Sequence, residues 1–118
     1  MAGRPKKDPQ RFADLFRVFG PVAVRRMFSG EGLFVDGLMM GLVAGERIYL
    51  KADAAGRAAF EAEGCPQFMI RRGEKQIGLP YFAMPERLYD DAEEFAVWAR
   101  RALAATKAKP ARKRVTSR

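Results

Sequence analysis

The chain has 118 residues, with 22 Lys and Arg against 14 Asp and Glu, a net charge of +8 and no histidine. This length supports one domain, and the missing histidine excludes a Ser-His-Asp triad, an imidazole metal ligand and a histidine general base. The single cysteine excludes an internal disulfide and a multi-cysteine zinc site, so we expect no metal and no cofactor.

The N-terminal part begins as a basic arm and continues as a helix. Residues 1–11 hold four basic residues, one acid and two prolines, which predicts a flexible arm. The apolar side chains that follow have the spacing i, i+3, i+4, i+7 of one helix face. They are Phe12, Leu15, Phe16 and Phe19. This stripe predicts a helix over about residues 9–19, which Gly20 and Pro21 end.

Residues 22–51 predict an antiparallel meander. Four apolar, β-branched or aromatic runs are separated by short turn signals. Strands are expected at 22–28, 33–35, 38–43 and 47–51, with turns at 29–32, 36–37 and 44–46. Gly30 and Gly32 lack the third glycine of a dinucleotide site and the Gly-Lys-Ser/Thr of a P-loop. We therefore favour a hairpin turn that needs positive φ over a phosphate cradle.

Residues 52–84 predict a helix followed by a hairpin. Asp53 is the expected N-cap, and Gly64 is the expected stop. Pro80 indicates an edge position or a bulge, because proline has no amide hydrogen to donate to a neighbouring strand. The expected elements are a helix from Asp53 to Glu63, strands at 67–70 and 77–84, and an exposed loop at 71–75.

The last helix follows a short helical turn at 85–89. Asp90 is its N-cap candidate, and the acidic residues at its start complement the helix dipole, which explains them without a metal site. Its expected buried face holds Phe95, Trp98, Ala99, Ala102 and Leu103. The element order predicts an α+β domain, in which an antiparallel sheet of about four meander strands plus a later hairpin packs on flanking helices.

The charge is concentrated in the two ends of the chain. The domain at 12–106 holds 12 basic and 13 acidic residues, whereas the tail at 107–118 holds six basic residues and no acid. We expect the tail to be disordered, and its charges are candidates for nonspecific contact with nucleic-acid phosphates. They are Lys107, Lys109, Arg112, Lys113, Arg114 and Arg118. A solvated, solubilising extension is the equally weighted alternative.

A smaller basic patch on the domain is a weaker hypothesis. Arg25 and Arg26 point to opposite faces of a strand, so at most one of them joins the basic residues of the loop at 71–75. Isolated, solvated charges are the favoured interpretation.

Five segments of the chain together resemble a known family. They are Arg26–Phe34, Asp36-Gly37, Ile48–Lys51, Leu79–Glu86 and Trp98–Ala102. Over about residues 12–105 the chain resembles the amino-terminal domain of the TfoX/Sxy family. The resemblance implies an α+β fold similar to that of type III secretion chaperones. It also implies a regulator of competence genes that acts with a cyclic-AMP receptor protein at promoters, and it offers no catalytic residue. Named members also carry a carboxy-terminal domain, whereas only a basic tail follows here.

The leading hypothesis is a non-enzymatic regulator or adaptor that binds protein partners, with the transcription machinery as a candidate. The alternative is a chaperone-like or ligand-binding module, which needs an exposed apolar groove. Core packing is the default interpretation of the many Phe and Met residues. A ligand groove or a homodimer face is the alternative interpretation. An enzyme ranks third, because it would need a cleft that gathers groups such as Tyr49, Tyr81 and Glu31 with shifted pKa values.

The sequence also bears on the location of the protein and on the reactivity of its single cysteine. The arm has no apolar stretch after its basic residues, and the central uncharged run from Gly37 to Gly45 is too short to cross a membrane. We expect no membrane contact and a cytoplasmic location. Cys65 has no basic neighbour in the sequence to lower its pKa, so a small packing residue is favoured over a reactive thiol.

Overall fold

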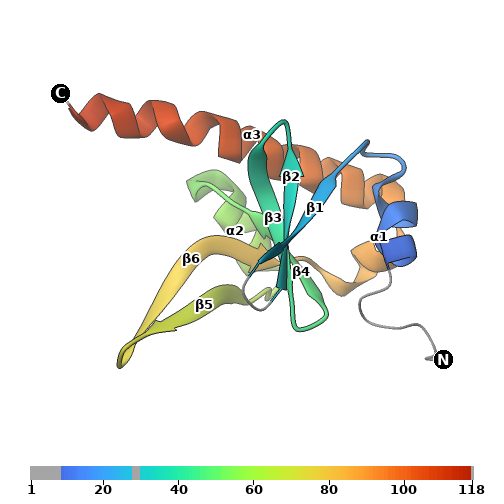
Figure 1. Ribbon diagram of the computed structural model, residues 1–118, viewed down its shortest axis with the longest axis horizontal. Helices are drawn as coiled ribbons and strands as arrows, with labels where there is room; N and C mark the ends of the chain where they lie inside the picture. Colours follow the sequence, from blue (N-terminus) through green and yellow to red (C-terminus); the bar gives the residue numbers. More distant parts are fainter. Residues whose placement is uncertain (1–8, 28–29, 118) are drawn as a thin grey trace.

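A single antiparallel sheet of six strands forms the centre of the molecule, and its buried side chains pack against three helices. The structure is a computed structural model that describes residues 9–27 and 30–117, with side chains for 13–27 and 30–107. The elements in chain order are α1 Pro9–Phe16, β1 Ala23–Met27, β2 Gly30–Val35, β3 Leu38–Ala44, β4 Arg47–Lys51, α2 Ala54–Ala62, β5 Gln67–Arg72, β6 Lys75–Ala83, the 3-10 turn η1 Glu86–Asp90 and α3 Ala92–Ser117. The strand order is β1-β2-β3-β4-β6-β5 (Figure 1). The predicted α+β fold is confirmed, while the likeness to secretion chaperones stays a prediction.

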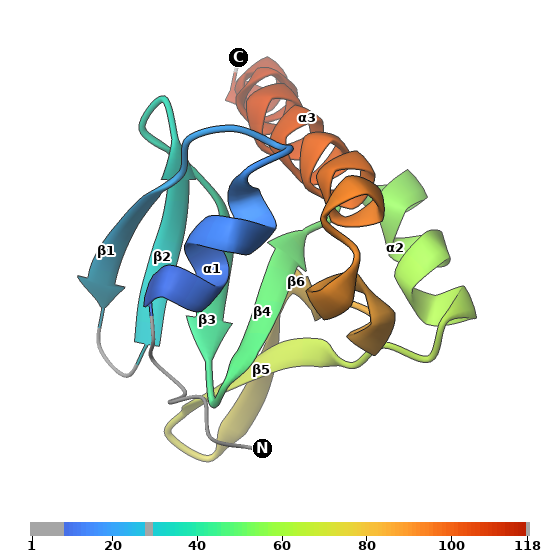
Figure 2. The ribbon, with the colours of Figure 1, turned by 90° about the vertical axis from the view of Figure 1, so that its right-hand side faces the viewer.

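One face of the sheet, which we call the helix-covered face, carries the core. Figure 2 shows α1 lying across this face. Its strand side chains are Leu33, Met40, Ile48, Leu50 and Phe82, all buried. Phe95 of α3 is fully buried. Its ring centroid lies 5.6 Å from that of Phe16 and 6.4 Å from that of Phe19. Leu15, Phe16 and Phe19 of the predicted stripe therefore do face the core, although α1 itself ends at Phe16 and a turn carries Phe19. The side chain of Phe12 lies outside the described part of the chain.

Two tight turns fix the register of the meander. Asp36 and Gly37 have φ of 53° and 80°, and Gly45 and Glu46 have φ of 54° and 71°. Two consecutive residues with positive φ form the turn type that matches the twist of paired strands. Both predicted hairpin turns are confirmed, and Glu46 shows that the second one tolerates a side chain in the left-handed region.

The prediction that Gly30 and Gly32 lie in a hairpin turn that needs positive φ is wrong. Both lie within β2, and neither is among the glycines with positive φ. A Cβ at Gly30 would collide with the backbone carbonyl of Val43 on β3, so close approach of two strands requires glycine there. Residues 28 and 29, where the turn was also expected, lie outside the described part of the chain.

The later hairpin is longer than expected, and Pro80 is in its interior. The exposed loop predicted at 71–75 reduces to the turn at Gly73 and Glu74, because Arg72 of β5 pairs with Lys75 of β6. β6 lies between β4 and β5, but β4 pairs only with residues 81–83 of β6, so Pro80 lies just beyond the part of the strand that β4 covers. The bulge option is confirmed, since Gln67 pairs with Phe82 and Met69 with Gly78, which leaves three β6 residues opposite one β5 residue.

α3 begins and ends later than the sequence predicts. Its N-cap interaction comes from Asp91, whose Oδ1 accepts a hydrogen bond of 3.0 Å from the Glu94 amide, whereas Asp90 closes η1. The backbone stays helical to Ser117, where a disordered tail was expected from 107. Ala, Lys and Arg in this segment are good helix formers, whereas Pro110 within it is not, because proline has no amide hydrogen to donate. Among the residues described, no helix is both long and apolar enough to cross a membrane.

Candidate functional site

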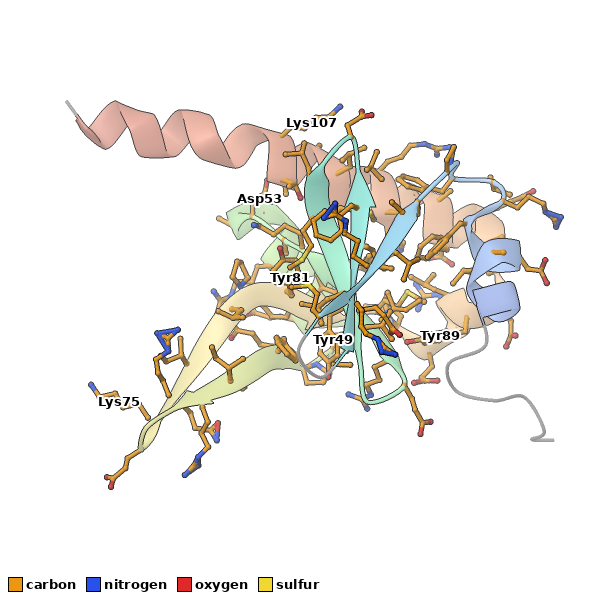
Figure 3. The ribbon with its side chains drawn as sticks, viewed as in Figure 1. Tyr49, Asp53, Lys75, Tyr81, Tyr89 and Lys107 are labelled. Atoms are coloured by element: carbon orange, nitrogen blue, oxygen red, sulfur yellow. The ribbon has the colours of Figure 1, made fainter. Side chains whose placement is uncertain are left out.

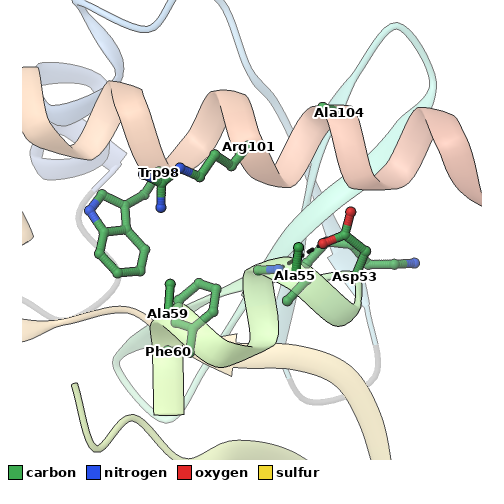
Figure 4. Close-up of a pocket in the computed structure, with 10 residues that line it drawn as sticks. Asp53, Ala55, Ala59, Phe60, Trp98, Arg101 and Ala104 are labelled. Atoms are coloured by element: carbon green, nitrogen blue, oxygen red, sulfur yellow. Dashed lines mark hydrogen bonds between the residues drawn. The ribbon is translucent and has the colours of Figure 1, made fainter. Parts of the chain in front are cut away.

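A groove of about 370 Å³ lies between α2 and α3 (Figure 4). It exists because α2 presents small residues, Ala55, Gly56 and Ala59, toward the larger helix. Phe60 of α2 and Trp98 of α3 meet with their ring centroids 5.0 Å apart at an edge-to-face angle of 64°. The full lining is Lys51, Ala52, Asp53, Ala55, Gly56, Ala59, Phe60, Trp98, Arg101 and Ala104.

The groove is apolar inside and positively charged on the α3 side. The Arg101 guanidinium lies 5.3 Å from the centroid of the Trp98 ring. The Asp53 carboxylate caps α2, as predicted, because its Oδ1 accepts a hydrogen bond of 2.8 Å from the Gly56 amide. The groove therefore suits an apolar group that carries an acidic neighbour.

Arg87, Glu63 and Glu94 form an ion-pair cluster beside Trp98, which we call the arginine clamp. Arg87 of η1 donates to both carboxylate oxygens of Glu63 at 2.8 and 3.0 Å, and to both oxygens of Glu94 at 2.8 and 3.1 Å. The Trp98 indole donates to Glu94 at 3.3 Å. The hydrogen bonds from Arg87 lower the pKa of Glu63 and of Glu94 below their ordinary values. Nothing in the sequence spacing marked this clamp, since its members come from three separate elements.

Replacing Arg87 by alanine should lower the melting temperature in a pH-dependent way. Both glutamates have a pKa lowered in the folded state, so their stabilising effect is present above their ordinary pKa near 4.5. That effect is lost as the pH falls through the lower, folded-state pKa. Thermal unfolding from about pH 7 to about pH 3 should show the gap between wild type and Arg87→Ala closing at acidic pH. A gap that is constant with pH would contradict a role for these charges.

The groups considered for acid–base chemistry do not meet in a cleft. Tyr81 and Tyr49 point to the face of the sheet opposite the core, and the Tyr81 hydroxyl donates to the Met39 carbonyl at 3.0 Å (Figure 3). Burial raises the pKa of Tyr81. Glu31 pairs with the core residue Val43, so its side chain lies on the other face. Among the described residues, no cluster of acidic or cysteine side chains could hold a metal ion.

Cys65 behaves as a packing residue. It is half-buried and contacts the core cluster, and burial is the main cause that raises the pKa of its thiol. A raised pKa leaves the thiol protonated and poorly nucleophilic at neutral pH. This supports the expectation of a small filler residue.

The predicted basic segment lies on the outer turns of α3. A helix of 26 residues is about 39 Å long, and its C-terminal part projects well beyond the sheet (Figure 1). Lys107 is exposed there, and Lys109, Arg112, Lys113 and Arg114 follow it on the helix backbone, while Arg118 lies outside the described residues. Their contact with nucleic acid stays a prediction.

Comparison with known proteins decides the family. Residues 14–106 match the family described as the TfoX N-terminal domain. The chain belongs to this TfoX family. A similar protein is the DNA transformation protein TfoX1 of Aliivibrio fischeri (strain ATCC 700601 / ES114), which is 36% identical over 77 residues. That alignment covers 65% of this chain and 37% of TfoX1, so the chain spans little more than a third of that relative's length. The resemblance seen in the sequence is thereby confirmed.

Proposed function

We propose that this TfoX-family protein is a non-enzymatic cytoplasmic regulator or adaptor of the competence type, which works by binding protein partners in the transcription machinery. The observation that carries the proposal is the family match over 14–106, together with the similarity to a protein named for DNA transformation. The groove between α2 and α3 supports a binding role, because it offers an apolar recess rather than a set of converging acid–base groups.

In this proposal the groove and the end of α3 have separate tasks. An apolar side chain of the partner enters beside Phe60 and Trp98, and an adjacent acidic group pairs with Arg101. The basic turns from Lys107 onward contact DNA phosphates without sequence preference. Because both features involve α3, a partner in the groove and DNA at its end would be held by one rigid element.

A ligand-binding or chaperone-like module is the second candidate. The groove that this alternative requires is present, and its volume is in the range of small-molecule pockets. The two candidates differ in the occupant, which is a protein in the first case and a small apolar molecule or unfolded segment in the second.

Groove-filling variants test the proposal and separate the two candidates. Ala55 lines the groove, whereas Ala58 is exposed on the same helix and does not. Ala55→Phe should abolish recovery of a transcription-machinery protein from cells, and Ala58→Phe should retain it. Mass spectrometry of the purified full chain should detect no small molecule that is bound to the wild type and missing from Ala55→Phe. Recovery that is equal in both variants, or a bound small molecule, would contradict the adaptor proposal.

The DNA contact has its own expected result. Neutralising Lys107, Lys109, Arg112, Lys113 and Arg114 to glutamine should strongly weaken the low-salt binding of duplex DNA and reduce its salt dependence. Neutralising Arg4, Lys6, Lys7 and Arg11, which removes four positive charges where the first set removes five, is the control at the other end of the chain. Gel-shift assays at about 50 and about 200 mM salt measure both effects. Binding unchanged by the first set of substitutions would remove DNA contact from the proposal.

A further inference from the structure

The face of the sheet opposite the core has an aromatic and methionine-rich surface, which we call the open face. Its large side chains are Met27, Phe34, Met39, Tyr49, Phe68 and Tyr81. A Cβ at Gly32 would meet Met27, Phe34 and Met39, so these three side chains gather over that glycine. Tyr49 and Phe68 form a second group, with ring centroids 5.0 Å apart and an angle of 62° between the rings.

The open face is partly accessible, and the β5–β6 hairpin bends away from the rest of the sheet beside it (Figure 1). The β5–β6 hairpin projects away from β1–β3 toward the side opposite α1 (Figure 1), and the Tyr81 hydroxyl reaches across β4 to the Met39 carbonyl. Tyr81 is only 7% exposed and forms the floor, whereas Phe34, Tyr49 and Phe68 are half-buried. Figure 3 shows Tyr49 and Tyr81 in the bend between the meander and this hairpin. The rings of Phe34, Tyr49 and Phe68 are therefore the ones that a ligand can reach.

Every charged residue that strand alternation places on the open face is basic. These residues are Arg25, Arg47, Lys51, Arg72 and Lys75. Two of the cations sit directly on aromatic rings, since Arg25 lies 5.1 Å from the Phe34 centroid and Lys51 lies 5.1 Å from the Tyr81 centroid. The only acid in the described strands, Glu31, faces the other way opposite Val43. The remaining acids of these hairpins, Asp36, Glu46 and Glu74, are in turns.

We infer that the open face binds single-stranded nucleic acid. Sequence-tolerant binders of single strands combine aromatic platforms for stacked bases with cations along the path of the phosphates. Here the rings come from β2, β4, β6 and β5, while Arg25 lies on the edge strand β1 and Arg72 on the opposite edge strand β5, paired with Lys75 of β6. A duplex fits poorly, because its base faces are stacked internally and cannot lie on half-buried rings. The C-terminal turns of α3 project toward the same side of the molecule as this hairpin (Figure 1).

This inference is separate from the proposed adaptor role, because the residues named for the open face and those that line the groove have only Lys51 in common. A protein partner or a second copy of the chain could also use an apolar sheet face. The uniform positive charge favours a polyanion over either of these, since two copies of a positively charged face repel each other.

Two pairs of neighbouring arginines give a matched test. Arg25 and Arg72 lie on the open face, whereas Arg26 and Arg71 are their exposed neighbours on the opposite face. The probe is fluorescent oligo(dT) or oligo(U) of about 15 nucleotides, titrated with the full chain and followed by anisotropy. The double variant Arg25→Gln/Arg72→Gln should lose about tenfold in affinity, and Arg26→Gln/Arg71→Gln less than about twofold. Comparing the two oligonucleotides distinguishes DNA from RNA as the preferred strand.

Removal of an aromatic platform completes the test. Phe34→Leu/Tyr49→Leu keeps apolar bulk and should weaken binding by about tenfold or more, with Phe19→Leu on the other side of the sheet as the control. Thermal unfolding verifies that both proteins are folded. Equal losses in the two arginine pairs, no binding at about 50 mM salt, or a dimer in sedimentation that Phe34→Leu/Tyr49→Leu dissociates would overturn the inference.

Discussion

Replacing Phe95 by alanine is expected to reduce the free energy of unfolding by about 3–5 kcal/mol, the largest effect of any single truncation proposed for this chain. Phe95 is fully buried and is the residue at which α3 meets the two rings from the N-terminal segment, Phe16 and Phe19. The variant loses the transfer free energy of the ring and leaves a cavity that these neighbours fill only in part. A domain of this size has a total stability of about 5–15 kcal/mol, so the loss is a large share of it.

Urea denaturation measures this loss, and Val97 provides the control. Val97 is two residues away on the same helix and is 45% exposed. Val97→Ala should change the free energy of unfolding by less than about 0.5 kcal/mol. A similar small loss for Phe95→Ala would mean that α3 does not pack on the sheet as described.

The second large effect is expected at Gly30. Gly30→Ala should destabilise the protein by about 1–3 kcal/mol, because the added methyl group meets the backbone carbonyl of Val43, which cannot rotate away. Relief requires β2 and β3 to separate at their pairing of Gly30 with Ala44. Without this contact, alanine would slightly favour the folded strand over glycine.

Gly32→Ala is the matched control, two residues along the same strand. Its Cβ would meet the ends of the Phe34, Met27 and Met39 side chains, which can move, so we expect a change below about 1 kcal/mol. Chemical denaturation of both variants measures the difference. Equal effects would show that close strand approach does not explain the glycine at position 30.

Local signals in the sequence were sufficient for the topology of the meander. The Asp36-Gly37 dipeptide and the alternation in residues 47–51 are determined by turn and strand geometry between neighbours in the chain, and both were predicted correctly. The Asp53 cap follows from the same local chemistry. At the start of α3 two adjacent aspartates compete, and η1 uses Asp90, which leaves the cap to Asp91.

Features that depend on distant strands were missed or misread. Gly30 resembles a turn residue in the sequence, and only its pairing with β3 shows that a close backbone contact requires it. A basic patch that joins one of Arg25 and Arg26 with the basic residues at 71–75 was only the weaker hypothesis, and isolated charges were favoured. Core acids and bases nearly cancel in number, and only the six-strand order reveals that Arg25 and Arg72 share a face without acids. The domain therefore carries a basic face although its 12 basic residues are outnumbered by its 13 acidic ones.

The central claim about the sheet is that its open face binds single-stranded nucleic acid, beside the adaptor role proposed for the groove, and NMR chemical-shift mapping tests this claim most directly. The full chain, labelled with ¹⁵N, is titrated with short oligo(dT). The largest amide shifts are predicted around Phe34 in β2, Tyr49 in β4 and Phe68 in β5, with the groove residues Ala55 and Ala59 unchanged. Shifts confined to the C-terminal turns of α3, with none on these strands, would contradict the account.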